Sequence, residues 1–153
     1  MSVYQQSATL RRAWSADLTP AGLYALLRLR VSIFVVEQNA AYEELDGLDL
    51  LDTTRHFWLE TDSATEPIAC LRLLEETGGF RIGRVCTVKE LRGRGLSRRL
   101  MEAALAEVGN AACVLEAQVQ AQGFYASFGF VPEGDTYLED DIPHITMRRP
   151  ARA

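Results

Sequence analysis

The chain has 153 residues, 48% of them hydrophobic and 24% charged, the balance of an ordinary globular protein able to bury a core without disulfides or metals. Its formal net charge of −5 argues against a general nucleic-acid binder, and no apolar run is long enough to span a bilayer. The first residues lack the basic and apolar pattern of a secretory signal. We therefore expect residues 1–153 to form one cytoplasmic domain that binds neither nucleic acid nor membrane.

Three cysteines, Cys70, Cys86 and Cys113, lie in apolar, strand-like stretches and lack the close spacing of a metal or redox motif. Buried free thiols are the expected state, which fits a reducing compartment. A single reactive thiol is the less common alternative. Only two histidines are present, and they are too far apart in sequence to predict zinc, so we expect no metal.

The first part of the chain predicts a strand, a helix and a loop. Residues Ala8–Trp14 have the pattern of a strand. Thr19 is a typical helix cap followed by Pro20 at the first helical position, and leucines at helical spacing continue the pattern into "VSIFVVEQ". The polar, acidic segment Asn39–Asp52 then predicts a loop.

Three strands are expected next. They comprise Thr54–Thr61, Glu66–Glu76 and Phe80–Val88, which are rich in β-branched, aromatic and apolar residues. The connections between them are short, so the three strands should form an antiparallel meander.

The last part of the chain alternates helices and strands. Apolar residues recur at helical spacing from Gly93 to about Val108, and a short buried strand is expected at Ala112–Ala117. A short helix should cover Ala121–Phe128, and the segments "FVPEGDTYLEDD" and "IPHITMRR" should form a closing hairpin. These elements predict an α+β fold.

The stretch "LRGRGLSRRLM" (Leu91–Met101) places a glycine turn between a strand and a helix. Gly93 and Gly95 allow a ligand to approach the backbone closely, and the unpaired N–H groups of the first helical turn carry partial positive charge. The turn thus predicts a phosphate or pyrophosphate site, although a capped helix with a solvated basic face fits the turn alone equally well. It is neither a P-loop nor a dinucleotide fingerprint, because Gly-Lys-Ser/Thr and G-x-G-x-x-G are absent.

The spacing of Arg92, Gly95 and Ser97 resembles the Q/R-x-x-G-x-G/A signature of the GCN5-related N-acetyltransferases (GNAT). Ser97 departs from the Gly or Ala of that signature but is still small. The resemblance implies that backbone amides of the turn hold the pyrophosphate of acetyl-CoA and that the preceding strand pairs with its pantetheine arm. The residues assigned to acetyl-CoA on this basis are Val85, Cys86, Thr87, Arg92, Gly93, Arg94, Gly95, Leu96, Ser97 and Arg98.

A second motif, "FYASFGF" (Phe124–Phe130), resembles the F-Y-x-x-x-G-F segment of the same family. Tyr125 falls on the tyrosine that family members often use as a general acid, and such a group can protonate a departing thiolate. Gln118 stands where many members have Asn, so we assign Gln118, Phe124 and Tyr125 to the cofactor site as well. Aromatic core packing is our interpretation of the phenylalanine rings and the alternative for Tyr125.

Longer stretches resemble the ElaA-type acetyltransferases more narrowly. "RVSIFVVEQNAAYEELDGLD" (Arg30–Asp49), His56 and "YLEDDIPHITM" (Tyr137–Met147) match that group in order, with Asp141 in place of a usual Gly. The resemblance implies the GNAT fold, a mixed, mostly antiparallel central sheet flanked by helices, with a V-shaped splay between the fourth and fifth strands. It specifies the acyl donor better than the acceptor.

An acceptor amine should bind beside the thioester, and its ammonium form must lose a proton before it attacks. Glu37, His56 and His144 are the candidate bases, since histidines and carboxylates with a raised pKa can take up that proton. Acidic residues in the loop could attract the ammonium group. The alternatives are a solvated loop for Glu43, Glu44 and Asp49, a salt bridge from Glu37 to Arg30, and a merely hydrogen-bonded His144.

These features together predict an N-acetyltransferase that moves an acetyl group from acetyl-CoA to a primary amine, on a small molecule or peptide, by direct transfer in a ternary complex. A non-catalytic CoA-binding sensor and an enzyme that uses another acyl-CoA are the alternatives. The second has a parallel in the acyl-homoserine-lactone synthases, which share the implied fold. The net charge argues against a nucleic-acid role for the arginine turn. The sequence is compatible with either a monomer or a homodimer.

Overall fold

The computed structural model describes residues 8–62 and 64–153. Residues 1–7 and Ser63 lie outside the described part, and with them the chain start at which we expected no secretory signal. One seven-stranded sheet has the spatial order β1-β2-β3-β4-β5-β7-β6. Its strands are β1 (Thr9–Trp14), β2 (Arg55–Thr61), β3 (Ala64–Glu76), β4 (Gly79–Thr87), β5 (Ala112–Gln118), β6 (Val131–Glu139) and β7 (Ile142–Arg149).

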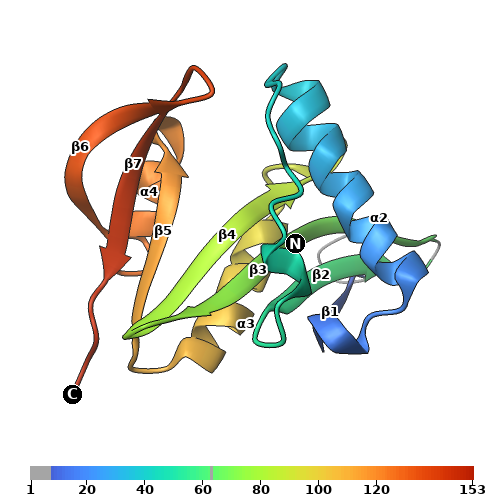
Figure 1. The fold of residues 1–153 in the computed structure, drawn as a ribbon, viewed down its shortest axis with the longest axis horizontal. Helices are drawn as coiled ribbons and strands as arrows, with labels where there is room; N and C mark the ends of the chain where they lie inside the picture. The colour runs from blue at the N-terminus through green and yellow to red at the C-terminus, as the bar shows by residue number, and fades with distance from the viewer. Residues whose placement is uncertain (1–7, 63) are drawn as a thin grey trace.

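All neighbouring strands are antiparallel except β4 and β5, which run parallel and pair at only three positions, from Gly79–Ala112 to Arg81–Val114. Beyond Arg81 the two strands diverge, and Figure 1 shows the sheet opening into two wings there. Gly79 permits the close approach at the junction, because a Cβ at this position would lie 2.3 Å from the Ala112 carbonyl oxygen. The GNAT fold with its splay between the fourth and fifth strands is confirmed.

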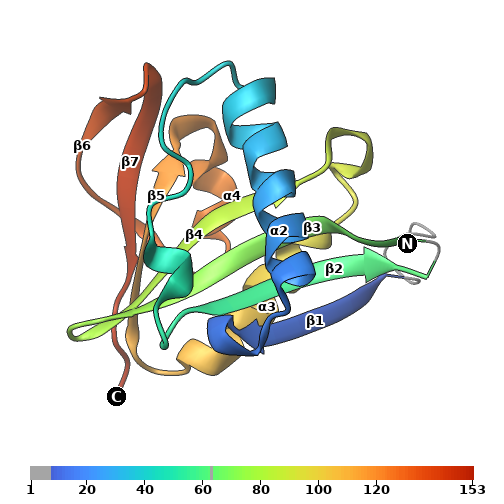
Figure 2. The same ribbon diagram turned by 45° about the vertical axis from the view of Figure 1, so that its right-hand side comes forward.

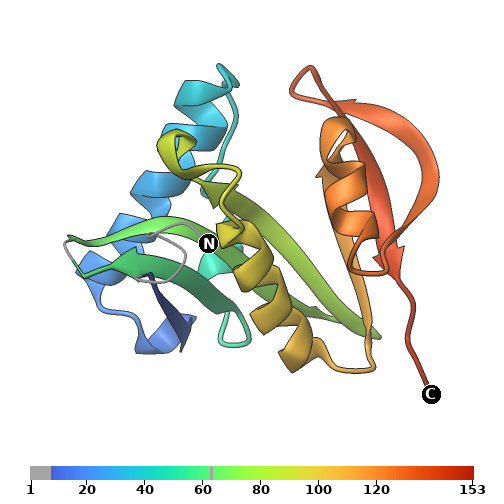
Figure 3. The same ribbon diagram turned by 180° about the vertical axis from the view of Figure 1, so that it is seen from behind.

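Helices cover both faces of the sheet. The helix α2 (Pro20–Arg30) packs on β3 from one face, and α3 (Leu96–Val108) packs on β2, β3 and β4 from the other (Figures 2 and 3). The helix α4 (Gln122–Ala126) lies against β5 in the second wing. Among the described residues, none of these helices is long and apolar enough to cross a membrane.

The start of α2 is set by its sequence, and its end departs from the prediction. The Thr19 side chain accepts a hydrogen bond from the Gly22 amide, and Pro20 occupies the first helical position, as expected. After Arg30 the chain widens into a π-helical segment (Val31–Glu37), with the Gln38 amide donating to the Ile33 carbonyl at 3.1 Å. Such widened turns are frequent at functional sites.

The main core lies between α3 and the sheet. Leu100, Met101 and Ala104 are fully buried on one face of α3, where they meet β-strand residues such as Leu59 and Leu73. This apolar face anchors the helix, so its first turn is fixed beside the end of β4. All three cysteines are buried and free, as predicted.

The strand β4 contains a bulge that the sequence analysis did not predict. Between the pairs Cys70–Cys86 and Arg72–Gly83 the register shifts, which leaves an extra residue in β4. Arg84 there has a φ of +54°, an uncommon conformation for a residue with a side chain. The bulge lies just where β4 leaves β5, so it redirects the backbone of β4 at the splay.

Candidate active site

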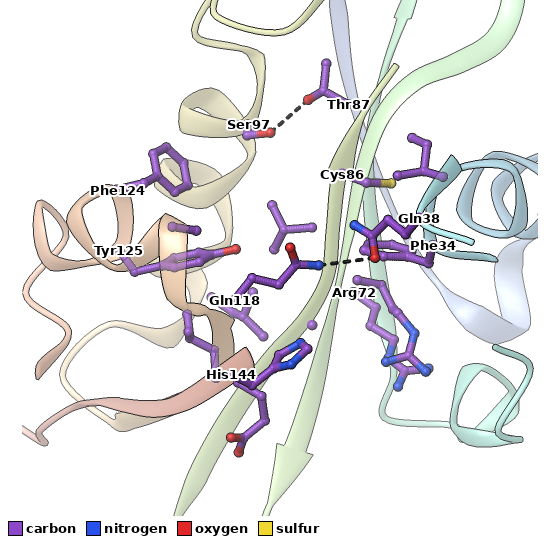
Figure 4. Close-up of a pocket in the computed structure, with 18 of the residues that line it drawn as sticks. Phe34, Gln38, Arg72, Cys86, Thr87, Ser97, Gln118, Phe124, Tyr125 and His144 are labelled. Carbon is purple, nitrogen blue, oxygen red and sulfur yellow. Dashed lines mark hydrogen bonds between the residues drawn. The ribbon is translucent and has the colours of Figure 1, made fainter. Parts of the chain in front are cut away.

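The splay between the two wings holds a cavity of about 680 Å³. Figure 4 shows its two ends, with Thr87 and Ser97 at one and Arg72 and His144 at the other. Of the predicted residues, the cavity brings together Val85, Cys86, Thr87, Arg92, Gly93, Gly95, Leu96, Ser97, Arg98, Gln118, Phe124, Tyr125 and His144. The predicted residues that do not line it are Arg94, Glu37 and His56.

The glycine turn exposes backbone amides to one end of the cavity. Gly93 and Gly95 both have a φ of +79°, and Gly95 is the N-cap of α3 without a side-chain cap. The first helical hydrogen bond runs from the Arg99 amide to the Gly95 carbonyl, which leaves the preceding amides of the first turn without helical partners. A Cβ on Gly93 would meet nothing within 4 Å. These features fit a pyrophosphate group.

Arg92 braces this turn through an ion pair with Glu37. Its guanidinium donates to both Glu37 oxygens, at 2.6 and 2.8 Å, and its Nε donates to the Thr87 carbonyl at 3.0 Å. Glu37 thus forms a salt bridge, as the alternative expected, but its partner is Arg92 and not Arg30, because Arg30 is bound to Glu44 and Asp49. The hydrogen bonds from Arg92 also hold the pKa of Glu37 below its ordinary value, which makes it a weak base.

Two further side chains of the turn are engaged within the protein. The Ser97 and Thr87 hydroxyls are 2.8 Å apart and share a hydrogen bond that joins α3 to the end of β4. Arg98 donates to the Ser127 hydroxyl at 3.0 Å and lies 4.7 Å from the centre of the Phe128 ring. The turn thus offers a ligand its backbone, while these side chains hold the turn in place.

Tyr125 reaches the middle of the cavity from α4. Its ring packs edge-on against Phe124 and Phe130, with centroid separations of 5.1 and 6.4 Å. Its hydroxyl points across the cavity toward β4 (Figure 4). Burial, with a smaller contribution from Cys86, raises the pKa of Tyr125 to about 12, so the hydroxyl keeps its proton at neutral pH.

His144 lies on β7, and one of its ring nitrogens is hydrogen-bonded. Its Nδ1 is 2.7 Å from the Ile142 carbonyl oxygen. A carbonyl can only accept, so Nδ1 carries the proton and the Nε2 of the neutral ring keeps a free lone pair. The ring stacks on Tyr137 at 5.9 Å and projects into the cavity (Figure 4).

Gln118 connects the two wings across the splay. Its side-chain amide donates to the Gln38 oxygen at 3.2 Å, which links the end of β5 to the end of the π-helical segment (Figure 4). Gln38 was not among the predicted site residues, although it directly follows the conspicuous "VSIFVVE" stretch.

His56 lies away from the cavity. It is 2% exposed on β2, and burial lowers its pKa despite a hydrogen bond to the Asp49 carbonyl. The ring is therefore neutral and buried beneath the loop that precedes β2. The structure does not bring His56 into reach of a molecule in the cavity, in contrast to its predicted role as a base.

The acidic loop is held by a closed ring of ion pairs. Three arginines and three carboxylates alternate in this ion-pair ring, each contacting two members of opposite charge at N–O distances between 2.5 and 3.3 Å. In order, the members are Arg30, Glu44, Arg84, Asp46, Arg72 and Asp49.

The ion-pair ring corrects the prediction of a solvated loop. Glu43 is exposed, as expected, but Glu44 and Asp49 are only 3% and 4% exposed. Their charges are balanced by arginines of α2, β3 and β4, which the loop sequence alone does not reveal. An incoming ammonium group therefore meets a neutral cluster here rather than a negative patch.

Two cavity residues escaped the sequence analysis although their strands carried signals. Arg72 interrupts the apolar run "ACLRLL", and an arginine at an inward strand position indicates a buried charge with partners. Gly83 precedes the bulge at Arg84, and a glycine inside a strand often marks such a bulge.

Comparisons with known proteins agree with this geometry. Residues 24–150 match the acetyltransferase (GNAT) domain. The chain belongs to the GNAT family.

Its relatives in the GNAT family include a UPF0039 protein of Mycobacterium tuberculosis, 54% identical over 145 residues that cover 92% of each chain. The ElaA protein of Escherichia coli is 39% identical over 143 residues, 88% of this chain and 91% of ElaA. The crystal structure of an acyl-CoA N-acyltransferase from Pseudomonas aeruginosa has a TM-score of 0.86 and 44% identity, covering 94% of this chain and 99% of that one. The predicted resemblance to ElaA-type GNAT proteins is confirmed.

Proposed function

We propose that this GNAT protein is an N-acetyltransferase that moves an acetyl group from acetyl-CoA to a primary amine of a small molecule or peptide. The proposal rests on one observation. A single cavity contains an amide-lined turn suited to a pyrophosphate, a protonated tyrosine and a histidine with a free lone pair. These are the groups that direct acyl transfer from a thioester to an amine needs.

The donor would bind along the splay. The amides around Gly93 and Gly95 would hold its pyrophosphate, and the edge of β4 at Val85–Thr87 would pair with its pantetheine arm. This edge of β4 is free to pair because β5 has already diverged from it. Acetyl-CoA supplies a thioester whose carbonyl carbon accepts the attacking amine.

The acceptor must be deprotonated before it attacks. His144 would take the proton of the ammonium group on Nε2, since its Nδ1 proton is held by the Ile142 carbonyl. The amine nitrogen then bonds to the thioester carbonyl, and a backbone N–H of β4 near Thr87 would stabilise the oxygen that becomes negative. When the carbon–sulfur bond breaks, the sulfur leaves with its electron pair as a thiolate.

Tyr125 would give its proton to that thiolate. A tyrosine with a pKa of about 12 is a weaker acid than a simple thiol of pKa ~8.5. The difference is smaller within the cavity, because the desolvation that raises the tyrosine pKa raises the pKa of a buried thiol as well. Tyr125 therefore acts while the bond breaks, when hydrogen bonding to the sulfur lowers the barrier. The new amide nitrogen loses its second proton through solvent to the Tyr125 oxygen, which restores the tyrosine.

The direct test uses purified protein, acetyl-CoA and a library of amines, with release of free thiol as the readout. We expect saturable thiol release with a subset of the amines. Saturable CoA binding without turnover on any amine would instead favour the sensor, and parallel assays with longer acyl-CoAs identify the preferred acyl group. Failure to bind CoA would contradict both functions.

The proposed cellular setting is the cytoplasm. Three buried free thiols fit a reducing cytoplasm. The proposed partners are the amine substrate and, as an alternative to a monomer, a second copy of the chain, without nucleic acid or membrane.

A further inference from the structure

One donor group of the cavity wall has no partner in the structure. The Nε of Arg72 is buried and makes no hydrogen bond within the described residues, although Arg72 as a whole is only 4% exposed. A buried guanidinium N–H without an acceptor is costly, so such a group calls for an explanation.

The rest of the Arg72 guanidinium is fixed. Nη1 donates to Asp46 at 2.9 Å and to Asp49 at 3.3 Å, and Nη2 donates to Asp46 at 2.6 Å. Both carboxylates belong to the ion-pair ring, so the guanidinium cannot rotate to satisfy Nε without breaking these bonds. The direction of the Nε–H is thus set by the fold.

Gly83 is the residue of the cavity wall that adjoins this N–H. Arg72 and Gly83 are paired across β3 and β4, and both line the cavity. A Cβ on Gly83 would lie 3.9 Å from Arg72 Nε, and nothing else would be within 4 Å of it. Because Gly83 has no side chain, the space beside Arg72 Nε on this side is left empty for an acceptor atom. In Figure 4, Arg72 lies at the end of the cavity shared with His144, away from Thr87 and Ser97.

We infer that the acceptor is an amine that also carries a carbonyl oxygen, which accepts the hydrogen bond from Arg72 Nε while the amine faces His144. This inference rests on the proposed function and names the substrate class of the same site. A carbonyl oxygen is an acceptor without a proton, as the Nε–H requires. Amides and carboxylates share this chemistry. The ion-pair ring is electrically balanced, with three arginines and three carboxylates. A neutral amide would therefore accept the hydrogen bond from Arg72 without adding a charge to the ring.

The test compares amine pairs in which one member carries an amide carbonyl and the other is its hydrocarbon analogue. The pairs have one, two or three carbons between amine and carbonyl, and alaninamide with isopropylamine is the shortest. Matching carboxylates such as alanine distinguish the acid from the amide. We expect kcat/KM to favour the carbonyl-bearing member of at least one pair by about tenfold or more, the worth of a hydrogen bond to a charged group.

The Gly83→Ala variant removes the effect of differing amine basicity, because basicity is the same for both proteins. Gly83 does not have a positive φ, so alanine fits its backbone while its methyl group occupies the space 3.9 Å from Arg72 Nε. We expect the preference of each responsive pair to shrink by about tenfold in the variant. The matched control is Gly123→Ala on α4, where a Cβ would meet nothing within 4 Å.

Equal kcat/KM within every pair, or a preference that Gly83→Ala leaves intact, would overturn the inference. Such a result is expected if a water molecule, and not the substrate, accepts the hydrogen bond from Arg72 Nε. If the wild-type protein released no thiol with any amine, the result would instead contradict the proposed function. A second readout does not depend on the variant. The Nε–H resonance of Arg72 in the wild-type protein should shift on titration with the preferred carbonyl-bearing amine and not with its hydrocarbon analogue; identical spectra would also overturn the inference.

Discussion

Burial and hydrogen bonding determine which atoms of single side chains in this cavity carry protons. Burial keeps Tyr125 protonated, and the Ile142 carbonyl fixes which nitrogen of His144 carries the proton. Glu37, another predicted base, is instead committed to Arg92. The residue types alone suggested three bases. The ion pair with Arg92 removes Glu37, and burial away from the cavity removes His56, which leaves His144.

Replacing Tyr125 by phenylalanine tests the proposed acid. The ring and its packing remain, while the proton donor is lost, so kcat should fall by about 10²-fold to 10⁴-fold. The dissociation constant of acetyl-CoA should change little, because the amide turn lies elsewhere in the cavity. Calorimetry and steady-state kinetics measure the two quantities, and an unchanged kcat would remove Tyr125 from the mechanism.

The proposed base is tested by removing it. The His144→Asn variant keeps a side-chain donor near the Ile142 carbonyl but lacks the base, so kcat should fall by about 10²-fold to 10⁴-fold. The dissociation constant of acetyl-CoA should change little, because His144 lies at the end of the cavity away from the amide turn (Figure 4). Steady-state kinetics and calorimetry measure the two quantities, and an unchanged kcat would assign the base to another group.

At the scale of elements, the sequence anticipated the order and the type of the helices and strands, because each has its own periodicity and cap. Thr19, Pro20 and the α3 leucines all have the predicted roles. Elements that depend on distant partners were missed. The Arg84 bulge arises from the pairing of β3 with β4, and the burial of Glu44 depends on Arg30 and Arg84 from other elements. The motif around the glycine turn located one end of the site, whereas Arg72 at the other end carried no motif.

The ion-pair ring should be essential for stability. Arg30 is 1% exposed, and its loss would leave Glu44 and Asp49 buried beside each other without their shared partner. The Arg30→Met variant should lose about 3–5 kcal/mol of unfolding free energy in chemical denaturation. The control, Arg11→Met, removes an arginine that is 55% exposed in its pair with Glu60, and its stability should stay close to that of the wild type. Equal stability of the two variants would contradict a structural role for the ring.

Acid should unfold the protein through the same ring. Burial opposes ionisation of Asp46, but its contacts with Arg72 outweigh this and hold its pKa at about 2, below the ordinary value of 3.8. A lowered folded-state pKa stabilises the fold above the ordinary value, and this stabilisation is lost as the pH falls toward 2. The melting temperature should therefore drop between pH 4 and pH 2, and less steeply in the Asp46→Asn variant. Parallel decreases in both proteins would exclude this contribution.

At the scale of the whole molecule, the site exists because the sheet divides. Three register pairs hold β4 to β5, and beyond them the wings separate and line the cavity from both sides. One wing provides the amide turn and Arg72, while the other provides Tyr125 and His144. In the proposed reaction, donor and acceptor would approach from opposite ends of the cavity and meet at its middle, as direct transfer in a ternary complex requires.

The most direct measurement follows both products of one reaction. Acetyl-CoA labelled in its acetyl group is incubated with the protein and a responsive amine, and mass spectrometry and a thiol assay quantify N-acetylated amine and free CoA. We predict equal amounts of the two products, with the label entirely on the amine nitrogen and the rate strongly reduced by Tyr125→Phe. Saturable CoA binding without any labelled amine would contradict the account.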